Sequence, residues 1–438
     1  MTATLTEAPQ AQPAVDIEVA RSWRTPIILG VVGLIAFVLF GLMTEGGGAT
    51  TTFVLSRPND LFTIPAITVP AQATAIALTV IAIALAGVSA WGVQNRRKIG
   101  MWLPTVYGIA LVLAVLVWAG AGRTATSIQL TGLLIGTVVL ATPLVFGSLA
   151  GTLCERSGIV NIAIEGQLLA GAFLAALVAG AVSSSTGSDS FGAYVGLVAA
   201  PIAGALVGAA LSLFAVRYWV DQIVVGVVLN VLVVGLTSFF FGTLMRENPE
   251  LNRAIGLPDL PIPVLSRIPV IGPVLFDQNM LVYLMYAIVI VLNIMLFKSR
   301  WGLRVRSVGE HPKAADTVGI KVNRTRVRNT ILGGAVAGLG GAFFTVASGL
   351  AFNKEMTGGK GYIALAAMIL GRWSPKGALA AALLFGFADS LREQFGIIGT
   401  SIPSQFLAML PYLATIFAVA GLVGHVRPPA AENIPYKK

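Results

Sequence analysis

The chain has 438 residues, of which 56% are hydrophobic and only 11% are charged, and its formal net charge at pH 7 is +10. A soluble globular chain carries roughly 25% charged residues, so most of this chain is expected to lie in a lipid bilayer. The basic excess does not require nucleic acid as a partner, because loops beside an anionic membrane leaflet produce the same charge balance. Cys154 is the single cysteine, which excludes an intrachain disulfide and a two-cysteine metal site.

Residues 1–26 are polar and contain several prolines and acidic side chains, which predicts a disordered cytoplasmic tail. No small-residue cleavage site follows the first apolar segment, so we expect a membrane anchor and not a removable signal peptide. Apolar segments then recur along the chain at residues 27–43, 69–91, 102–119, 128–150, 158–182, 193–215, 223–241, 280–297, 329–349, 361–371, 376–391 and 405–423.

These segments predict an all-α fold, a polytopic transmembrane helix bundle of about 10–12 membrane segments, since roughly 17–25 apolar residues cross the hydrocarbon. The segment 361–371 is too short to span alone and predicts half of a broken or re-entrant helix. If the N-terminus lies inside and the sides alternate, 21 of the 29 Lys and Arg fall on the cytoplasmic side. This bias predicts that both termini are cytoplasmic.

The longest polar run, residues 298–328, carries nine Lys and Arg against two acidic residues and lies between apolar segments. Such a loop is expected to stay in the cytoplasm. Its middle predicts a helix of about two turns, because Pro312 suits the first helical position and Gly319 the residue just past the end. A short helix on a basic loop is a candidate docking site for a soluble partner. The alternative is an ordinary positive-inside loop without a partner.

Polar side chains within apolar segments are costly in lipid, so each is a candidate functional residue. Asn161 and Glu165 are four positions apart and would share a helix face. Asn230 lies in the middle of an apolar segment, and Asp389 is expected at a membrane boundary. Each could line a solute path, or could hold neighbouring helices together through hydrogen bonds. The candidates for the path are Asn161, Glu165, Gln167 and Asn230.

The sequence contains no zinc-protease, serine-hydrolase or phosphate-loop motif. Gly358-Gly359-Lys360-Gly361 is the nearest imitation of a phosphate loop, but it lacks the spacing and the Ser or Thr of that motif. The chain is therefore not expected to hydrolyse ATP or to be an enzyme, and we predict no catalytic residue, metal or cofactor of its own.

Three stretches resemble the membrane permeases of ABC importers, in the family that serves branched-chain amino acids, ribose-like sugars and nucleosides. They are most similar to its nucleoside-type branch. The stretches are ATPLVFGSLA through ERSGIVNIAIEG (residues 141–166), RSVGEHPKAADTVGI (306–320), and GRWSPKGA through FGFADSL (371–391). The resemblance covers about residues 126–425. It leaves outside the extra membrane segments of residues 27–125 and a cytoplasmic tail of residues 426–438.

The resemblance implies an assembly of two permease chains, cytoplasmic ATPase subunits that bind the ATP, and an extracytoplasmic solute-binding lipoprotein, in a bacterial-type cell membrane. The run 298–328 would then be the loop that couples to the ATPase. The residues implied in that contact are Glu310, Pro312, Lys313, Ala314, Ala315, Asp316 and Gly319. Of these, the two alanines and the glycine match the general motif Glu-Ala-Ala-x-x-x-Gly, whereas Lys313 replaces its glutamate.

The implied function is ATP-driven import of nucleosides. Phe146 joins the candidates for the path, because a nucleobase stacks on aromatic side chains. A monosaccharide or a branched-chain amino acid is the alternative solute within the same class. A proton- or ion-coupled secondary transporter is the alternative from another class. It needs ionisable groups along the path, for which only Glu165 is a good candidate.

Overall fold

The computed structural model describes residues 22–97, 100, 102–122, 127–399, 406, 409, 412 and 427–437. The predicted disordered tail lies outside these residues as far as residue 21, and so does nearly all of the predicted segment 405–423. The chain divides into two compact units, Met1–Thr52 with Thr68–Ser127 and Phe53–Ile67 with Ile128–Lys438.

The first unit holds the helices α1 (Arg24–Ala36), its π-helical extension η1 (Phe37–Leu42), α2 (Ala71–Gln94) and α3 (Trp102–Gly120). The strands β1 (Thr50–Val54) and β2 (Ile67–Pro70) lie where the chain passes between the units. A Cβ added to Gly33 of α1 would lie 3.2 Å from Ile83 Cγ1 of α2. The Tyr107 hydroxyl of α3 donates a hydrogen bond to the Leu29 carbonyl of α1 at 2.7 Å. Close backbone approach and such polar bonds hold helices together in lipid.

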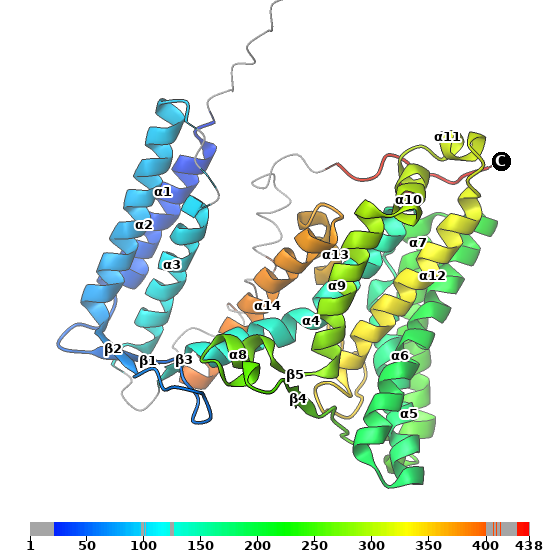
Figure 1. Ribbon diagram of the computed structural model, residues 1–438, viewed down its shortest axis with the longest axis horizontal. Helices are drawn as coiled ribbons and strands as arrows, with labels where there is room; N and C mark the ends of the chain where they lie inside the picture. The colour runs from blue at the N-terminus through cyan, green and yellow to red at the C-terminus, as the bar shows by residue number, and fades with distance from the viewer. Residues whose placement is uncertain are drawn as a thin grey trace, which may run out of the picture. The chain divides into compact units, whose positions relative to one another are not determined.

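The second unit contains β3 (Ile128–Gln129), α4 (Leu130–Glu155), α5 (Ile164–Thr186), α6 (Asp189–Ser212), η2 (Leu213–Arg217), α7 (Gln222–Phe240), η3 (Phe241–Met245), η4 (Pro249–Asn252), β4 (Asp259–Pro261), η5 (Leu265–Arg267), α8 (Ile271–Leu275), β5 (Asp277–Asn279), α9 (Met280–Lys298), α10 (Arg300–Glu310), α11 (Pro312–Thr317), α12 (Val322–Gly341), η6 (Ala342–Phe344), α13 (Lys360–Leu370) and α14 (Pro375–Ile398). Figure 1 shows α10 and α11 at the end of this unit where α9 finishes and α12 begins.

Eight helices within the described residues are long and apolar enough to cross a membrane. α12 and α14, with 20 and 24 residues, are also long enough but carry more charged side chains. α13 has only 11 residues, the length expected of a half-helix. The prediction of an all-α, polytopic helix bundle is confirmed.

α6 and α12 cross at glycines. A Cβ added to Gly204 of α6 would lie 2.1 Å from the Gly334 carbonyl oxygen and 2.6 Å from the Cα atom of Gly338, both in α12. A side chain does not fit in that space, so the two backbones meet here only because these residues are glycines. α12 also packs on α4 and α5. It therefore connects the basic loop before it to three long helices of the unit.

Between α4 and α5 the chain is unwound over residues 156–163. We predicted a helix that places Asn161 and Glu165 on one face, and this is wrong, because α5 begins only after Asn161. Gly158 adopts φ +89°, a conformation that interrupts the helix and favours glycine. A Cβ at Gly158 would also lie 2.7 Å from Nη2 of Arg326. The close approach of Arg326, from a distant part of the sequence, is therefore a second reason for a glycine at this break.

The segment 53–67 belongs to the second unit, although the residues before it (1–52) and after it (68–127) belong to the first. Its strand β1 pairs in parallel with β3. The Thr131 hydroxyl of α4 donates a hydrogen bond to the Leu55 carbonyl at 2.5 Å, and Arg57 forms an ion pair with Asp277 at 3.2 Å. The segment is thus fixed both to the start of α4 and to β5, which lie far apart in the sequence of the second unit.

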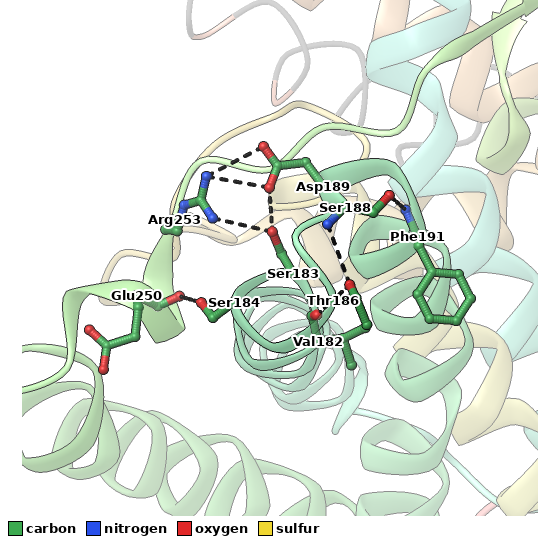
Figure 2. A network of polar contacts seen from close by, with 9 residues as sticks. All are labelled: Val182, Ser183, Ser184, Thr186, Ser188, Asp189, Phe191, Glu250 and Arg253. Atoms are coloured by element: carbon green, nitrogen blue, oxygen red, sulfur yellow. Dashed lines mark hydrogen bonds and ion pairs between the residues drawn. The ribbon is translucent and has the colours of Figure 1, made fainter.

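The turn between α5 and α6 is tied to the proline-rich stretch that follows η3, as Figure 2 shows. Arg253 Nη1 donates to Ser183 Oγ at 3.2 Å, and Nη2 lies 3.4 Å from the Asp189 carboxylate, to which Ser183 also donates. Ser188 caps α6 by accepting a hydrogen bond from the Phe191 amide at 3.4 Å. The proline-rich stretch forms only short elements, among them the antiparallel pair β4–β5.

Candidate functional site

α11 spans Pro312–Thr317 in the middle of the basic loop, as predicted. Pro312 occupies its first position, where the missing N–H has no helical partner to lose. His311 caps this end, because its Nδ1 atom accepts a hydrogen bond from the Ala314 amide at 3.1 Å. Neighbouring residues in the sequence therefore determine where the helix begins.

The other end of α11 forms a Schellman motif. Gly319 has φ +82°, and its amide donates to the Asp316 carbonyl at 2.9 Å. The next amide, of Ile320, donates to the Ala315 carbonyl at 3.0 Å. Glycine adopts this left-handed conformation without strain. The motif stops the helix after six residues.

The two alanines of α11 differ in exposure. Ala315 is 2% exposed and packs with Val308 of α10 and Val322 of α12. Ala314 is exposed, and Val318 directly after the helix is 75% exposed. Ala315 therefore fixes α11 to its neighbours, whereas Ala314 and Val318 belong to its outward surface.

The outward surface of α11 adjoins a hollow of about 550 Å³ beside the start of α12. None of the described residues that line the hollow is acidic, and half of them are basic: Arg300, Arg304, Lys321, Arg324 and Arg328. The surface around α11 is therefore strongly basic. A concentration of positive charge of this kind attracts an acidic partner.

The two carboxylates of the basic loop are engaged within the chain. Glu310 lies 4.0 Å from Arg156 and accepts a hydrogen bond from a backbone amide of the C-terminal segment at 3.3 Å. Asp316 is partly buried on α11 and is hydrogen-bonded to Tyr436. Lys313, in contrast, is exposed on α11.

Glu165 holds the start of α13. Its Oε1 atom accepts hydrogen bonds from the Thr357 hydroxyl at 2.6 Å and the Gly359 amide at 2.8 Å, and its Oε2 atom accepts one from the Gly361 amide at 2.6 Å. The first amides of a helix have no partner within it, and a carboxylate there is favoured by the helix dipole. Glu165, 8% exposed, thus supplies the missing acceptors for a half-helix nearly 200 positions away.

Asn230 of α7 connects three other stretches of the second unit. Its Oδ1 atom accepts a hydrogen bond from the Gly166 amide at 2.8 Å. Its Nδ2 atom donates to the Ile162 carbonyl at 2.9 Å and to the Tyr362 hydroxyl of α13 at 3.2 Å. The side chain, 4% exposed, therefore fixes the unwound link, the start of α5 and α13 together.

Asn161 and Gln167 form a reciprocal amide pair. Asn161 Nδ2 donates to Gln167 Oε1 at 3.0 Å, and Gln167 Nε2 donates to Asn161 Oδ1 at 3.2 Å. Phe146 of α4 packs against Gly340 of α12, where an added Cβ would lie 2.5 Å from that of Phe146. All three side chains are fully buried. The five candidates for the path thus lie in the interior of the second unit.

Sequence reasoning missed an ion pair between Lys360, the first residue of α13, and Asp389 of α14. We expected Asp389 at a membrane boundary, and it is 4% exposed, with Arg392 Nη2 at 4.0 Å from its second oxygen. The one sequence signal was a lysine at the start of a short apolar segment. Within the described part of the chain, no group of three His, Cys, Asp or Glu side chains could hold a metal ion.

The multi-pass helix bundle has an unwound link, a half-helix and a short helix on a basic loop, and broken helices of this kind are typical of membrane transport proteins. Residues 133–423 match the family described as the permease component of branched-chain amino acid transport systems, and the chain belongs to this family. It is therefore a permease subunit of the ABC importer type. The family implies an ATPase, a second permease chain and a binding protein as partners.

Curated relatives of the chain include permeases with named solutes. It is 38% identical over 309 residues to the guanosine ABC transporter permease protein NupQ of Bacillus subtilis, which covers 69% of this chain and 95% of the relative. It is 38% identical over 308 residues to the nucleoside ABC transporter permease protein NupC of Lactococcus lactis, with the same coverage. It is 31% identical over 307 residues to the putative glucose ABC transporter permease protein TsgC13 of Haloferax volcanii, covering 65% of this chain and 89% of the relative. No solved structure gives a significant match.

Proposed function

We propose that the chain is the transmembrane permease subunit of an ATP-driven importer of nucleosides, and that a separate ATPase subunit acts on it through α11. The observation that carries the proposal is the structure of α11. This six-residue helix is capped at both ends, and it buries one alanine and exposes the other. The sequence contains no phosphate-loop motif. The free energy of ATP hydrolysis therefore has to reach this chain from a partner.

The outward surface of α11 suits a groove on the ATPase. Ala314 is small enough for the partner backbone to approach closely, and Val318 supplies apolar area that becomes buried on docking. The surrounding arginines and lysine attract an acidic rim. Lys313 stands where the general motif has a glutamate, so we expect the partner to place a carboxylate opposite it.

Displacement of α11 would reach the broken helices of the second unit. Ala315 fixes α11 to α10 and α12, and α12 packs on α4, α5 and α6. Glu165 and Asn230 hold the start of α13 and the unwound link, so we assign to them the positioning of the solute path. The remaining candidates, Asn161, Gln167 and Phe146, stiffen the same region. Access would alternate when this region changes its packing.

We place both termini and the basic end of the second unit in the cytoplasm of a bacterial-type cell. Three segments that the charge count assigns to the cytoplasmic side lie together at this end: the link after α4, the basic loop and the turn between α13 and α14. Arg156 of the link is 4.0 Å from Glu310 of the loop and donates a hydrogen bond to the Trp373 carbonyl of the turn at 2.9 Å. The opposite end, with the Arg253–Asp189 bridge of Figure 2, would face the solute-binding lipoprotein. A second permease chain would complete the path.

Substitution of Thr317 tests the docking role of α11. Its hydroxyl is exposed and donates to the Ala314 carbonyl at 2.8 Å, and Thr186 at the end of α5 makes the matching bond to Val182 at 2.7 Å (Figure 2). We expect Thr317→Asp to reduce capture of the purified ATPase at least about tenfold, because the new carboxylate repels an acidic rim. The control Thr186→Asp should leave capture unchanged. Equal capture by the two variants contradicts the proposal.

The nucleoside assignment is supported by the identity of 38% to the guanosine and nucleoside permeases, against 31% to the putative glucose permease. Uptake of labelled guanosine, uridine, glucose and leucine into proteoliposomes that hold the complete importer measures the solute. We expect ATP-dependent uptake of the two nucleosides alone. Uptake of glucose or leucine without nucleosides refutes the assignment, and uptake driven by a proton gradient without the ATPase indicates a secondary transporter.

A further inference from the structure

Residues 427–437, named here the C-terminal clasp, lie along the basic end of the second unit. Figure 1 shows this red segment passing α10 and α11 to the end of the chain. The Ala431 amide donates to the Gly309 carbonyl of α10 at 2.8 Å, and the Lys437 ammonium lies 4.6 Å from the centre of the Trp219 ring. The clasp therefore contacts both α10 and the stretch after η2.

Arg326 of α12 joins the clasp to the unwound link between α4 and α5. Its side chain is 1% exposed, and its guanidinium donates to the carbonyls of Ile434 at 2.8 Å and Ala431 at 3.3 Å. Gly158 of the link lies against the same guanidinium. A buried charge is strongly unfavourable unless its N–H groups are bonded. The clasp carbonyls are thus required partners of this arginine.

Tyr436 brings the clasp into contact with α11 itself. It packs against the apolar cluster that fixes α11, formed by Val308, Ala315 and Val322. Its hydroxyl is hydrogen-bonded to Asp316, and burial together with this bond raises the pKa of the tyrosine. Tyr436 is therefore positioned to follow α11 when α11 moves.

The middle of the clasp is connected to the turn between α13 and α14 through Glu155 of α4. The Glu432 carboxyl faces that of Glu155 at the end of α4, and Glu155 accepts a hydrogen bond from Trp373 Nε1 in the turn. Arg156 holds the same turn through the Trp373 carbonyl. Oε2 of Glu432 is buried without a hydrogen-bond partner among the described groups, and a proton between the two carboxyls would satisfy it.

We propose that the C-terminal clasp transmits the motion of the ATPase: Arg326, Glu432 and Tyr436 are positioning residues that make α11, α12 and the α13–α14 turn move as one body. This inference rests on the proposed function of α11. Energetic coupling between distant sites requires packed, hydrogen-bonded elements that move together. Without the clasp, α11 keeps its own caps and outward surface, so the ATPase still docks. Its motion then reaches the α13–α14 turn less completely.

Removal of residues 428–438 tests the clasp in the complete importer in proteoliposomes. We expect ATPase capture within about twofold of the full chain, and at least about fivefold less guanosine transported per ATP hydrolysed, the lower end of typical coupling between sites. A synthetic peptide of residues 428–438 should restore the ratio. An unchanged ratio refutes the proposal. Loss of ATPase capture also refutes it, because the clasp would then be part of the docking surface.

Point variants test the same inference in a chain of full length. Tyr436→Ala removes the contact with α11, and the control Phe239→Ala removes an aromatic ring of α7 that is 60% exposed in the same unit. We expect the ratio of guanosine to ATP to fall for Tyr436→Ala alone, and the conservative Tyr436→Phe, which keeps the packing, to recover most of it. Equal ratios for Tyr436→Ala and Phe239→Ala refute the proposal.

A distance measurement separates failure of the clasp from failure of the proposed function, because it needs no transported solute. Spin labels at Asn323→Cys of α12 and Lys376→Cys at the start of α14, both exposed positions in a Cys154→Ser chain, report on the two ends of the proposed body. When ATP binds to the assembled importer, the distance between labels should stay constant with the clasp and change without it. The same behaviour in both chains refutes the clasp. The docking role of α11 fails separately, if Thr317→Asp leaves ATPase capture intact.

Discussion

Replacing Glu165 by Gln is expected to release the start of α13. The carboxylate accepts hydrogen bonds from the Thr357 hydroxyl and from the amides of Gly359 and Gly361. The glutamine side chain has one acceptor oxygen where the carboxylate has two. Its NH₂ group would face one of these N–H or O–H donors, to which it cannot hydrogen-bond. A hydrogen bond to a charged group contributes about 1.5–3 kcal/mol, and its loss leaves a buried donor unsatisfied. We expect local opening of residues 357–361 to require about 2 kcal/mol less, which is about a 30-fold larger opening constant.

Hydrogen–deuterium exchange of the chain in nanodiscs measures this opening. The amides of Gly359 and Gly361 should exchange about 30-fold faster in Glu165→Gln than in the original chain. Glu250→Gln is the matched control, because its side chain is exposed and its backbone carbonyl, which the substitution keeps, makes the contact with Ser184 (Figure 2). Equal exchange in the original chain and Glu165→Gln would mean that packing, and not the carboxylate, holds α13.

Three further predictions concern stability and pH. Gly204→Ala should lower the midpoint of thermal unfolding in detergent, because overpacking at the α6–α12 crossing costs about 1–3 kcal/mol. Gly235→Ala, which adds its Cβ to open space, should not, and equal midpoints contradict the glycine argument. Asp389→Asn leaves the largely buried ammonium of Lys360 without its carboxylate and should cost about 3–5 kcal/mol in the same assay. Replacing both residues by apolar side chains should recover the midpoint, and an unchanged midpoint for Asp389→Asn shows that the pair is dispensable. Burial raises the pKa of the Glu432 carboxyl above its ordinary value of 4.5, so the docked clasp binds a proton that the undocked clasp releases. Docking should therefore be strongest below that ordinary value and weaken as the pH rises through the raised pKa. Glu432→Gln should remove this dependence. Amide protection of the clasp, corrected for intrinsic exchange, checks the prediction, and protection independent of pH in both chains contradicts it.

The ends of α11 could be predicted from the sequence because the residues that determine them act on their own neighbours. Pro312 suits a first turn, and Gly319 suits a left-handed helix end, wherever they occur. Which alanine is buried could not be predicted in this way. Ala315 is buried by Val308 and Val322, and these residues meet only because α10 and α12 pack together.

The unwound link and the cap of α13 depend on partners that lie far away in the sequence. Gly158 is an ordinary small residue of an apolar segment until Arg326 packs against it. Glu165 is a polar residue on a helix until residues 357–361 approach it. The clasp left no sequence pattern either, because much of its binding uses backbone carbonyls and amides, which every residue carries.

The segment 53–67 limits how the three N-terminal helices can be separated from the rest of the chain. A chain that begins at residue 126, where the family resemblance begins, leaves β3 without its strand partner and removes the Leu55 carbonyl that the Thr131 hydroxyl bonds. Removal of the helices therefore requires two cuts, with the segment kept as a separate piece that can pair with the second unit. In evolutionary terms, one deletion in the gene cannot discard these helices and spare the strand. Their loss or exchange would have to be accompanied by a replacement for β1.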